Sequence, residues 1–234
     1  MASPITTIFS AAAGLLLLIA PPLQAETSSP HPHQGVLTPF GAQPPRLSLD
    51  EEDNKRLRSG TYVIKQSEGE KSGGGIIVQD IHAPVGRVWE TILSFENYPQ
   101  WVKHVNYCQP YERSGNHIKV AFELGVIGFS YRYFIDHIVD PQQHYLRWTL
   151  DYQRNSELDD VVGFWHAEAH PDKPGWTRLY YSVSIRLKGW MPGFLQSFIS
   201  RSGLKDATAW VKEVAEQPLP ATLQSDVVTG VPSH

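Results

Sequence analysis

Five strand-like segments follow one another between residues 118 and 187, with no helical pattern between them. Each is rich in β-branched and aromatic residues, and turn clusters such as Ser114-Gly115-Asn116 and Asp140-Pro141 separate them. Because consecutive strands joined by short turns pair antiparallel, this part of the chain predicts an antiparallel sheet. The segments are Ile118–Gly125, Phe129–Val139, Tyr145–Tyr152, Val161–His170 and Trp176–Leu187.

Helical periodicity occurs before and after these strands. The segment Pro84–Leu93 carries apolar residues at i, i+3, i+4 and i+7, which predicts an amphipathic helix with proline in its first turn. A strand at Gly75–Ile81 precedes it, and a second short helix is expected at Phe95–Val102. The last element, from about Pro192 to Ala215, is predicted to be a helix with a break at Gly203. This order predicts an α+β fold with the helices on one side of a curved sheet.

The two ends of the chain lack such periodicity. Residues 8–20 form an apolar run that is too short for a membrane span, which needs about 20 residues. With the Pro21-Pro22 exit, the run predicts a signal peptide over residues 1–25 and export to a periplasmic, lumenal or extracellular location. An uncleaved anchor or an organelle-targeting segment is the alternative, since no Lys or Arg precedes Arg46.

Composition sets the limits of the folded domain. Residues 26–46 are rich in Pro and Ser and are predicted to be a disordered linker, and residues 217–234 a disordered tail. One domain, residues 47–216, remains between them. The single cysteine, Cys108, excludes an intrachain disulfide and is expected to be a small buried side chain.

Several short motifs occur in the same order as in a known superfamily. They are Ile81–Trp89 followed by Phe95–Trp101, Asp140-Pro141 ahead of Leu146–Trp148, Gly163–Trp165 ahead of Gly175–Tyr181, and Leu204–Glu213. With these motifs the chain resembles the START-like (SRPBCC) superfamily, and within it the polyketide-cyclase and coenzyme-Q-binding-like branch, over about Gly75–Glu216. The resemblance implies a helix-grip fold, in which the terminal helix lies across a curved antiparallel sheet and encloses a hydrophobic cavity.

Strand alternation indicates which side chains would line such a cavity. In the segment Tyr145–Tyr152, one face carries Leu146, Trp148 and Leu150. Aromatic side chains with polar tips suit an apolar pocket that offers a few hydrogen bonds, and the chain has seven Trp, ten Tyr and nine Phe. A core without a cavity is the alternative for each residue taken singly. The expected ligand-binding residues are Trp101, Phe122, Leu124, Tyr133, Trp148, Trp165 and Tyr181, with Phe194 and Phe198 at the cavity mouth.

Two clusters of ionisable residues are better explained as solvated surface than as reactive sites. His166, Glu168 and His170 alternate on one strand face, but three such ligands would spread over roughly 13 Å, too far for one metal ion. They are expected on the solvated outer face, and no metal is predicted. The neighbouring acids Glu157 and Asp159-Asp160 are expected in a solvent-facing turn.

These features favour a binding protein without a cofactor. The net charge of −4 argues against a nucleic-acid-binding surface. We expect an exported, monomeric carrier of a hydrophobic small molecule, whether lipid, isoprenoid or aromatic, that contacts membranes at most transiently. The alternative is a cyclase/aromatase-type enzyme that uses the same cavity. It would require inward-pointing ionisable residues, for which the candidates are Arg132, His137 and Arg147.

Overall fold

The computed structural model describes residues 29–65, 75–126, 129–188 and 201–218. The predicted signal peptide, almost all of the predicted C-terminal tail, and the predicted lip residues Phe194 and Phe198 lie outside these ranges. Within them, no helix has both the length and the apolar character needed to cross a membrane.

The described residues form eight strands and a small number of helices. In chain order these are α1 (Glu51–Arg58), β1 (Val63–Lys65), β2 (Ile76–Ile81), α2 (Val85–Leu93), the 3₁₀ helix η1 (Phe95–Asn97), α3 (Tyr98–Trp101), β3 (Val105–Ser114), β4 (His117–Val126), β5 (Phe129–Asp140), β6 (Tyr145–Leu150), β7 (Leu158–Ala169), β8 (Thr177–Leu187) and α5 (Arg201–Ala215).

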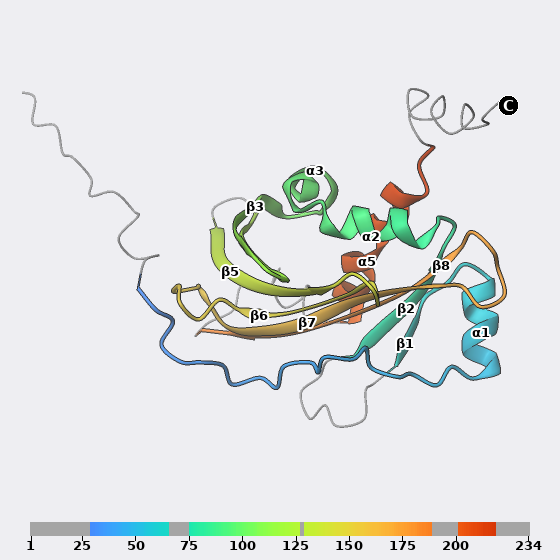
Figure 1. Cartoon of the computed structure of the whole chain (residues 1–234), viewed down its shortest axis with the longest axis horizontal. Coiled ribbons are helices and arrows are strands. Elements are labelled where there is room, and N and C mark those ends of the chain that lie inside the picture. The colour runs from blue at the N-terminus through green and yellow to red at the C-terminus, as the bar shows by residue number, and fades with distance from the viewer. Residues whose placement is uncertain (1–28, 66–74, 127–128, 189–200, 219–234) are drawn as a thin grey trace, which may run out of the picture.

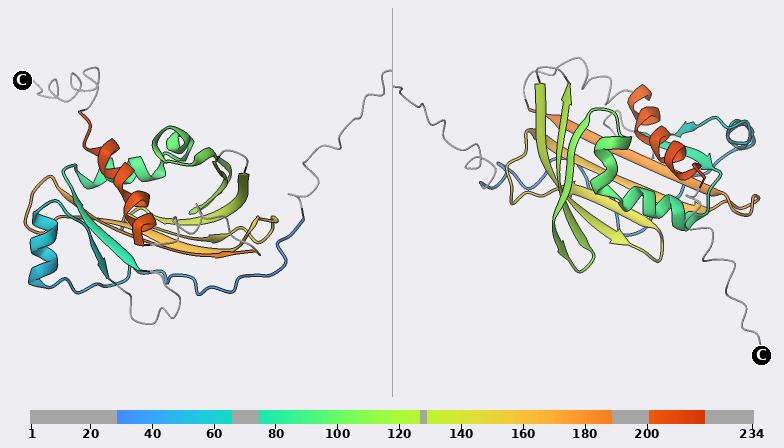
Figure 2. Two further views of the ribbon diagram at one scale, coloured as in Figure 1. Left: turned by 180° about the vertical axis from the view of Figure 1, so that it is seen from behind. Right: turned by 90° about the horizontal axis from the view of Figure 1, so that it is seen from above.

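All eight strands belong to one antiparallel sheet in the order β1-β2-β8-β7-β6-β5-β4-β3. The sheet is curved, and α2, α3 and α5 lie on its concave face (Figure 1). The views in Figure 2 show α5 lying across the strands beside α2. The α+β class and the placement of the helices on one side of the sheet are therefore as predicted.

Alternate residues of each strand face opposite sides of the sheet, as the sequence pattern predicts. Leu146, Trp148 and Leu150 of β6 lie in the main core beneath the helices. Tyr145, on the other face, packs with Phe164 in a separate small cluster. The concave side therefore holds the principal apolar core.

Helix α5 continues through Gly203, so the predicted break there is wrong. The helix buries Trp210 and Val211 against the concave face of the sheet. A glycine within a helix costs only about 1 kcal/mol relative to alanine. The packing of this apolar face offsets that cost.

The sequence patterns did not predict β3 or α1. Strand β3 is an edge strand of mixed polarity whose register shifts between Pro110 and Glu112. Proline is tolerated at such an edge or bulge, although it argues against a strand in the sequence alone. Cys108, in the same strand, is fully buried, as expected. Helix α1 starts with a capping box between Asp50 and Asp53, which is the local signal for its N-terminus.

Residues 29–46, here called the strap, contain no helix or strand but run along the sheet face opposite the helices (Figure 1). The backbone N–H groups of Val36 and Leu37 donate to Oδ2 of Asp160, at 2.6 and 2.7 Å. Asp160 is fully buried and also accepts a hydrogen bond from the Tyr152 hydroxyl. The prediction of a solvent-facing acidic turn is wrong for Asp160, because these donors replace water around its carboxylate.

The strap also covers apolar side chains on this face. The ring of Phe40 meets that of Phe164 edge-on, with 4.7 Å between centroids. The hydroxyl of Tyr145 donates to the Gly41 carbonyl at 3.2 Å. His31 is buried, and its backbone N–H donates to the carbonyl of Tyr152. The prediction of a disordered linker is therefore wrong for residues 29–46, since contacts with strands far along the chain order a segment without periodicity.

The outer face of β7 differs from the prediction at its end. Glu168 is exposed, as expected, and accepts from the Tyr180 hydroxyl at 2.6 Å. His170 is instead buried, with its Nε2 2.8 Å from Oδ2 of Asp80, whose Oδ1 accepts from Nε of Arg178 at 2.9 Å. His170 is not solvated because its ring takes the place of water at this buried carboxylate of β2 and, through Nδ1, accepts from the backbone N–H of Asp172. No three His, Cys, Asp or Glu side chains of the described ranges come together as metal ligands.

Candidate functional site

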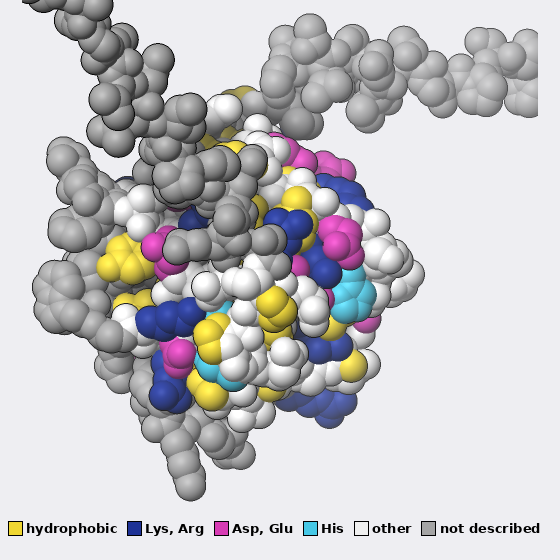
Figure 3. Space-filling model, turned by 90° about the vertical axis from the view of Figure 1, so that its left-hand side faces the viewer, with side chains coloured by type: hydrophobic (Ala, Val, Ile, Leu, Met, Phe, Trp, Pro, Cys, Tyr) yellow, Lys and Arg dark blue, Asp and Glu magenta, His cyan; other side chains and the backbone are white. Residues whose placement is uncertain are grey.

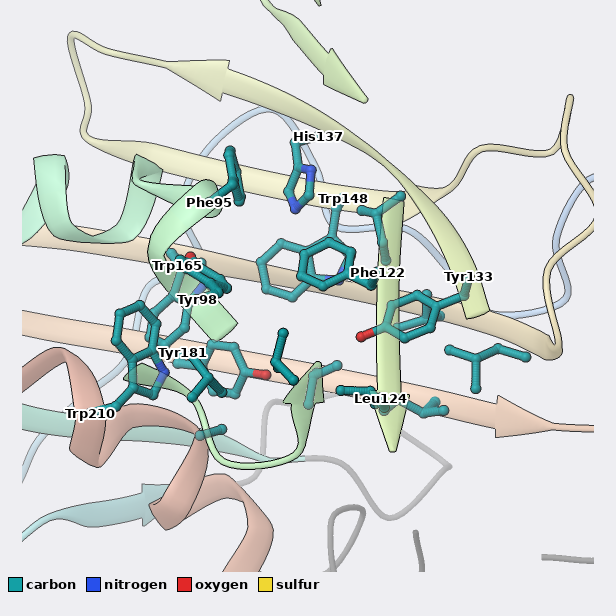
Figure 4. A pocket seen from close by; sticks show the side chains of 18 residues that line it. Phe95, Tyr98, Phe122, Leu124, Tyr133, His137, Trp148, Trp165, Tyr181 and Trp210 are labelled. Carbon is teal, nitrogen blue, oxygen red and sulfur yellow. The ribbon is translucent and has the colours of Figure 1, made fainter. Parts of the chain in front are cut away.

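A cavity of about 110 Å³ lies between the concave face of the sheet and helices α3 and α5. This volume is of the same order as the ~150 Å³ apolar cavity that stays dry and binds benzene. Figure 4 shows the side chains that line it. They are Phe95, Tyr98, Val102, Val105, Phe122, Leu124, Tyr133, Ile135, His137, Trp148, Leu158, Val161, Trp165, Tyr181, Val183, Ile185, Ala207 and Trp210.

The two-residue repeat of the strands supplies most of this lining. Tyr133, Ile135 and His137 are alternate residues of β5, and all three face the cavity. On the helical side, Ala207 and Trp210 are three residues apart on α5, which places them on one helix face. The cavity therefore forms where the inward rows of several strands meet one face of α5.

Pairs of aromatic rings in contact make the walls. Phe122 and Tyr133, on the paired strands β4 and β5, stack nearly parallel with 5.2 Å between centroids and 3° between ring planes. Trp165 and Tyr181 are 4.1 Å apart on β7 and β8. Trp210 of α5 meets Trp165 edge-on at 6.3 Å. Such pairs contribute about 0.5–1.5 kcal/mol beyond the burial of their area, which favours fixed walls.

Two tyrosine hydroxyls reach into the cavity. In Figure 4 the oxygen atoms of Tyr133 and Tyr181 point toward one another from opposite walls. Burial raises the pKa of both phenols above its ordinary value of 10.0, so both are neutral at pH 7. They can donate or accept a hydrogen bond.

Among the side chains that line the cavity, His137 is of the residue type most often used as a general acid or base. It is 4% exposed, and the rings of Phe95 and Trp148 lie 4.8 and 5.8 Å from its own. Burial lowers its pKa from 6.5 to about 3, against the opposing effect of a hydrogen bond to the backbone of Ile118. The imidazole is therefore neutral at physiological pH.

No Asp, Glu, Lys or Arg occurs among the described residues that line the cavity. The molecular face shown in Figure 3 is different, because acidic and basic side chains are interspersed there with small groups of hydrophobic ones. A charged group entering the cavity would lose its hydration without gaining an ion pair, at a cost of several kcal/mol. The site therefore suits neutral molecules.

Six of the predicted ligand-binding residues line the cavity: Phe122, Leu124, Tyr133, Trp148, Trp165 and Tyr181. Trp101 is not among the described lining residues but stacks on Trp210, with 6.1 Å between centroids. Phe194 and Phe198 lie outside the described residues.

Of the three ionisable candidates, only His137 faces the cavity. Arg132 lies at the surface, where its Nη2 donates to Glu123 at 2.9 Å. Arg147 is on the opposite face of the sheet and donates to the carbonyl of Phe40 in the strap. The outward positions of both arginines follow from the alternation of β5 and β6, in which His137 and Trp148 point inward.

Several lining residues were missed as site residues. Val161 and Ile185 continue the inward rows of Trp165 and Tyr181, so their strand phase could have identified them. Trp210 of α5 lies in the main core and lines the cavity, but it was not among the expected ligand-binding residues. Periodicity identifies the buried face of an element and not where facing elements leave space between them.

Comparison with known proteins agrees with this architecture. A family model described as polyketide cyclase / dehydrase and lipid transport matches residues 81–212. These residues extend from the end of β2 into α5 and include most of the cavity lining. No curated protein sequence matches the chain.

Solved structures share the fold at low sequence identity. The Zhui aromatase/cyclase from Streptomyces sp. R1128 is 14% identical, with a TM-score of 0.54 over 64% of this chain and 96% of that one. A START superfamily protein from Mycobacterium smegmatis is 16% identical, with a TM-score of 0.50 over 62% and 97%. A STAR-related lipid transfer protein from Xanthomonas axonopodis is 9% identical, with a TM-score of 0.50 over 67% and 93%. The helix-grip fold predicted for the chain is confirmed.

Proposed function

The chain belongs to the polyketide cyclase/dehydrase and lipid transport family, and from this premise we propose that it binds and carries a neutral, largely apolar small molecule containing a ring. The observation that carries the proposal is the cavity itself. Its described walls are aromatic and aliphatic, its polar groups are few, and none of them is charged at pH 7.

Binding accounts for these polar groups better than acid–base catalysis does. A general acid or base works best when its pKa lies near the working pH. Burial lowers the pKa of His137 to about 3 and raises that of Tyr133 and Tyr181, so none of them exchanges protons readily near pH 7. Each can still form a hydrogen bond that orients a ligand.

The cyclase/aromatase-type enzyme is the second candidate. One observation favours it: a neutral imidazole and two phenols surround one small apolar space, where they could hold a reactive chain in a folded conformation. Such an enzyme would act by orienting its substrate and would need no charged residue in the cavity.

We also propose that the protein acts outside the cytoplasm, as a monomer that can contact membranes transiently. The support for export is the apolar run at residues 8–20 with its Pro-Pro exit. N-terminal sequencing of the protein from the producing cell should find a chain that begins near Glu26. An intact Met1 in a membrane fraction would contradict export with cleavage.

Ligand binding can be tested with a small neutral probe. Trp148, Trp165 and Trp210 line the cavity, so binding of 4-fluorotoluene should change the intrinsic tryptophan fluorescence. Ala207→Leu adds three carbons to the cavity wall and should weaken binding at least tenfold. Ala209→Leu, the same change at a half-buried α5 position that lines a different groove and not the cavity, is the matched control and should leave binding unaltered.

The natural ligand can be sought by native mass spectrometry of protein purified from the producing cell. A bound neutral compound that is released unchanged supports a carrier. Conversion of that compound during incubation with the protein would establish the enzyme instead. A folded protein that binds neither the probe nor a cellular compound would contradict both functions.

A further inference from the structure

The position of His137 gives the cavity a defined polar feature. His137 is 4% exposed, and its ring lies among aromatic side chains. Phe95, Phe122 and Trp148 surround it, with ring centroids 4.8, 6.2 and 5.8 Å from that of the imidazole. A hydrogen-bonding group in such surroundings is largely shielded from bulk water.

The hydrogen bond at one ring nitrogen of His137 determines whether the other nitrogen donates or accepts. Nδ1 of His137 lies 3.2 Å from the carbonyl oxygen of Ile118. A carbonyl oxygen can only accept, so Nδ1 carries the proton. Because the imidazole is neutral, Nε2 then has no proton and is a hydrogen-bond acceptor.

Nε2 points into the cavity. Figure 4 shows the ring of His137 with one nitrogen directed toward the space above Trp148. Among the described residues, no side chain or backbone group donates a hydrogen bond to this atom. Nε2 is open to the cavity, so a ligand that supplies a donor forms a hydrogen bond with it on binding.

We propose that the ligand carries a hydroxyl group, phenolic or alcoholic, and that Nε2 of His137 accepts its hydrogen bond inside the cavity. This specificity contact rests on the function proposed above and narrows its ligand to a neutral hydroxylated ring compound.

The residues that line the cavity disfavour a ligand that carries a carboxylate or an ammonium group. The lone pair of Nε2 repels a carboxylate, and the described lining holds no cation that would compensate for it. An ammonium group would lose its hydration without meeting a carboxylate. The hydroxyls of Tyr133 and Tyr181 lie in the same cavity and can accept or donate, so the test must separate their contribution from that of His137.

Two probes of nearly equal size make this distinction. 4-Methylphenol has an O–H donor, and 4-fluorotoluene has fluorine in its place. Isothermal titration calorimetry should show that the wild-type protein binds 4-methylphenol about tenfold more tightly, which is about 1.4 kcal/mol. In His137→Phe the preference should fall to near onefold, while 4-fluorotoluene binds as before. Tyr181→Phe and Tyr133→Phe should keep most of the preference.

A measurement on the wild-type protein is independent of these variants. In protein labelled with ¹⁵N-histidine, the Nε2 resonance of His137 should move toward the protonated range when 4-methylphenol is added. 4-Fluorotoluene should not produce this shift.

The possible outcomes separate this inference from the proposed function. Binding of 4-fluorotoluene without a preference for 4-methylphenol, or a preference that survives in His137→Phe, would overturn the role of His137 alone. Loss of the preference in Tyr181→Phe or Tyr133→Phe but not in His137→Phe would assign the contact to that tyrosine. Failure of the folded wild-type protein to bind either probe would contradict the proposed function itself.

Discussion

The indole of Trp148 lies against Gly163 of the neighbouring strand, in the space that a side chain at position 163 would occupy. The carbonyl oxygen of Ser182 also lies only 2.5 Å from the position of a Cβ atom there. This part of the cavity wall therefore depends on the absence of a side chain at residue 163.

Gly163→Ala should destabilise the protein by about 1–3 kcal/mol, because Trp148 and the backbone of β8 would have to move. Chemical denaturation followed by circular dichroism measures this change. Gly86→Ala in α2 is the matched control. A Cβ there meets nothing within 4 Å, so this change should be neutral or stabilise by up to about 1 kcal/mol. Equal effects of the two substitutions would contradict the packing described.

Asp80 should contribute strongly to the stability of the fold at the end of the sheet where β2 pairs with β8. Its carboxylate is buried and holds both Arg178 and His170. Asp80→Asn leaves the buried guanidinium without its counter-charge and should cost about 3–5 kcal/mol in the free energy of unfolding. Glu213→Gln, on the surface of α5, should change it by less than about 0.5 kcal/mol.

The same carboxylate should make stability depend on pH. Burial by itself would raise the pKa of Asp80, but the hydrogen bond and charge of Arg178, with those of His170, hold it below its ordinary value of 3.8. A carboxyl with a depressed folded-state pKa stabilises the fold above its unfolded pKa and loses that contribution as pH falls through the folded value. The unfolding free energy of the wild-type protein should therefore decline below about pH 4. In Asp80→Asn this component of the decline should be absent.

The strap should detach when its buried anchor is removed. Asp160→Ala removes the acceptor for the N–H groups of Val36 and Leu37 and for the Tyr152 hydroxyl. We expect faster amide exchange and proteolytic cleavage within residues 29–46, with a loss of about 1–3 kcal/mol for the buried donors left unpaired. Asp206→Ala, at an exposed position of α5, is the control and should leave the strap protected. A strap equally protected in both variants would show that Asp160 does not hold it.

Cys108 should be unreactive in the folded protein. Its side chain is fully buried, and burial raises the pKa of its thiol far above the ordinary value of 9.0. The thiolate is the reactive form, so the rate of modification by a disulfide reagent at pH 8 should follow the rate or extent of unfolding. Rapid modification in the absence of denaturant would contradict the packing of β3 on β4.

Much of the fold follows from short-range patterns in the sequence. Leu146, Trp148 and Leu150 face the helices because side chains alternate along a strand, and this holds in any antiparallel sheet with one covered face. The helix from Val85 to Leu93 is likewise predicted by the spacing of its own apolar residues.

Edge elements were harder to predict because their local patterns are mixed. Strand β3 has one covered and one partly exposed face, and it contains Pro110 beside a shift in register. Each feature weakens a strand prediction when read locally. Pairing with β4 over most of its length compensates for both.

Only the tertiary structure decided which polar residues are buried and where space remains between the elements. Asp160 and His170 occur in sequences typical of a solvated surface, but the strap and the carboxylate of Asp80 take the place of water around them. The pattern of its own strand did not assign His137 to either face of the sheet. Its protonation depends on the ring of Phe95 and the carbonyl of Ile118, which belong to other elements. The sequence by itself determined which face of each helix or strand is buried, because periodicity depends on residues a few positions apart. The partners of buried polar groups and the cavity depend on residues that only folding brings together.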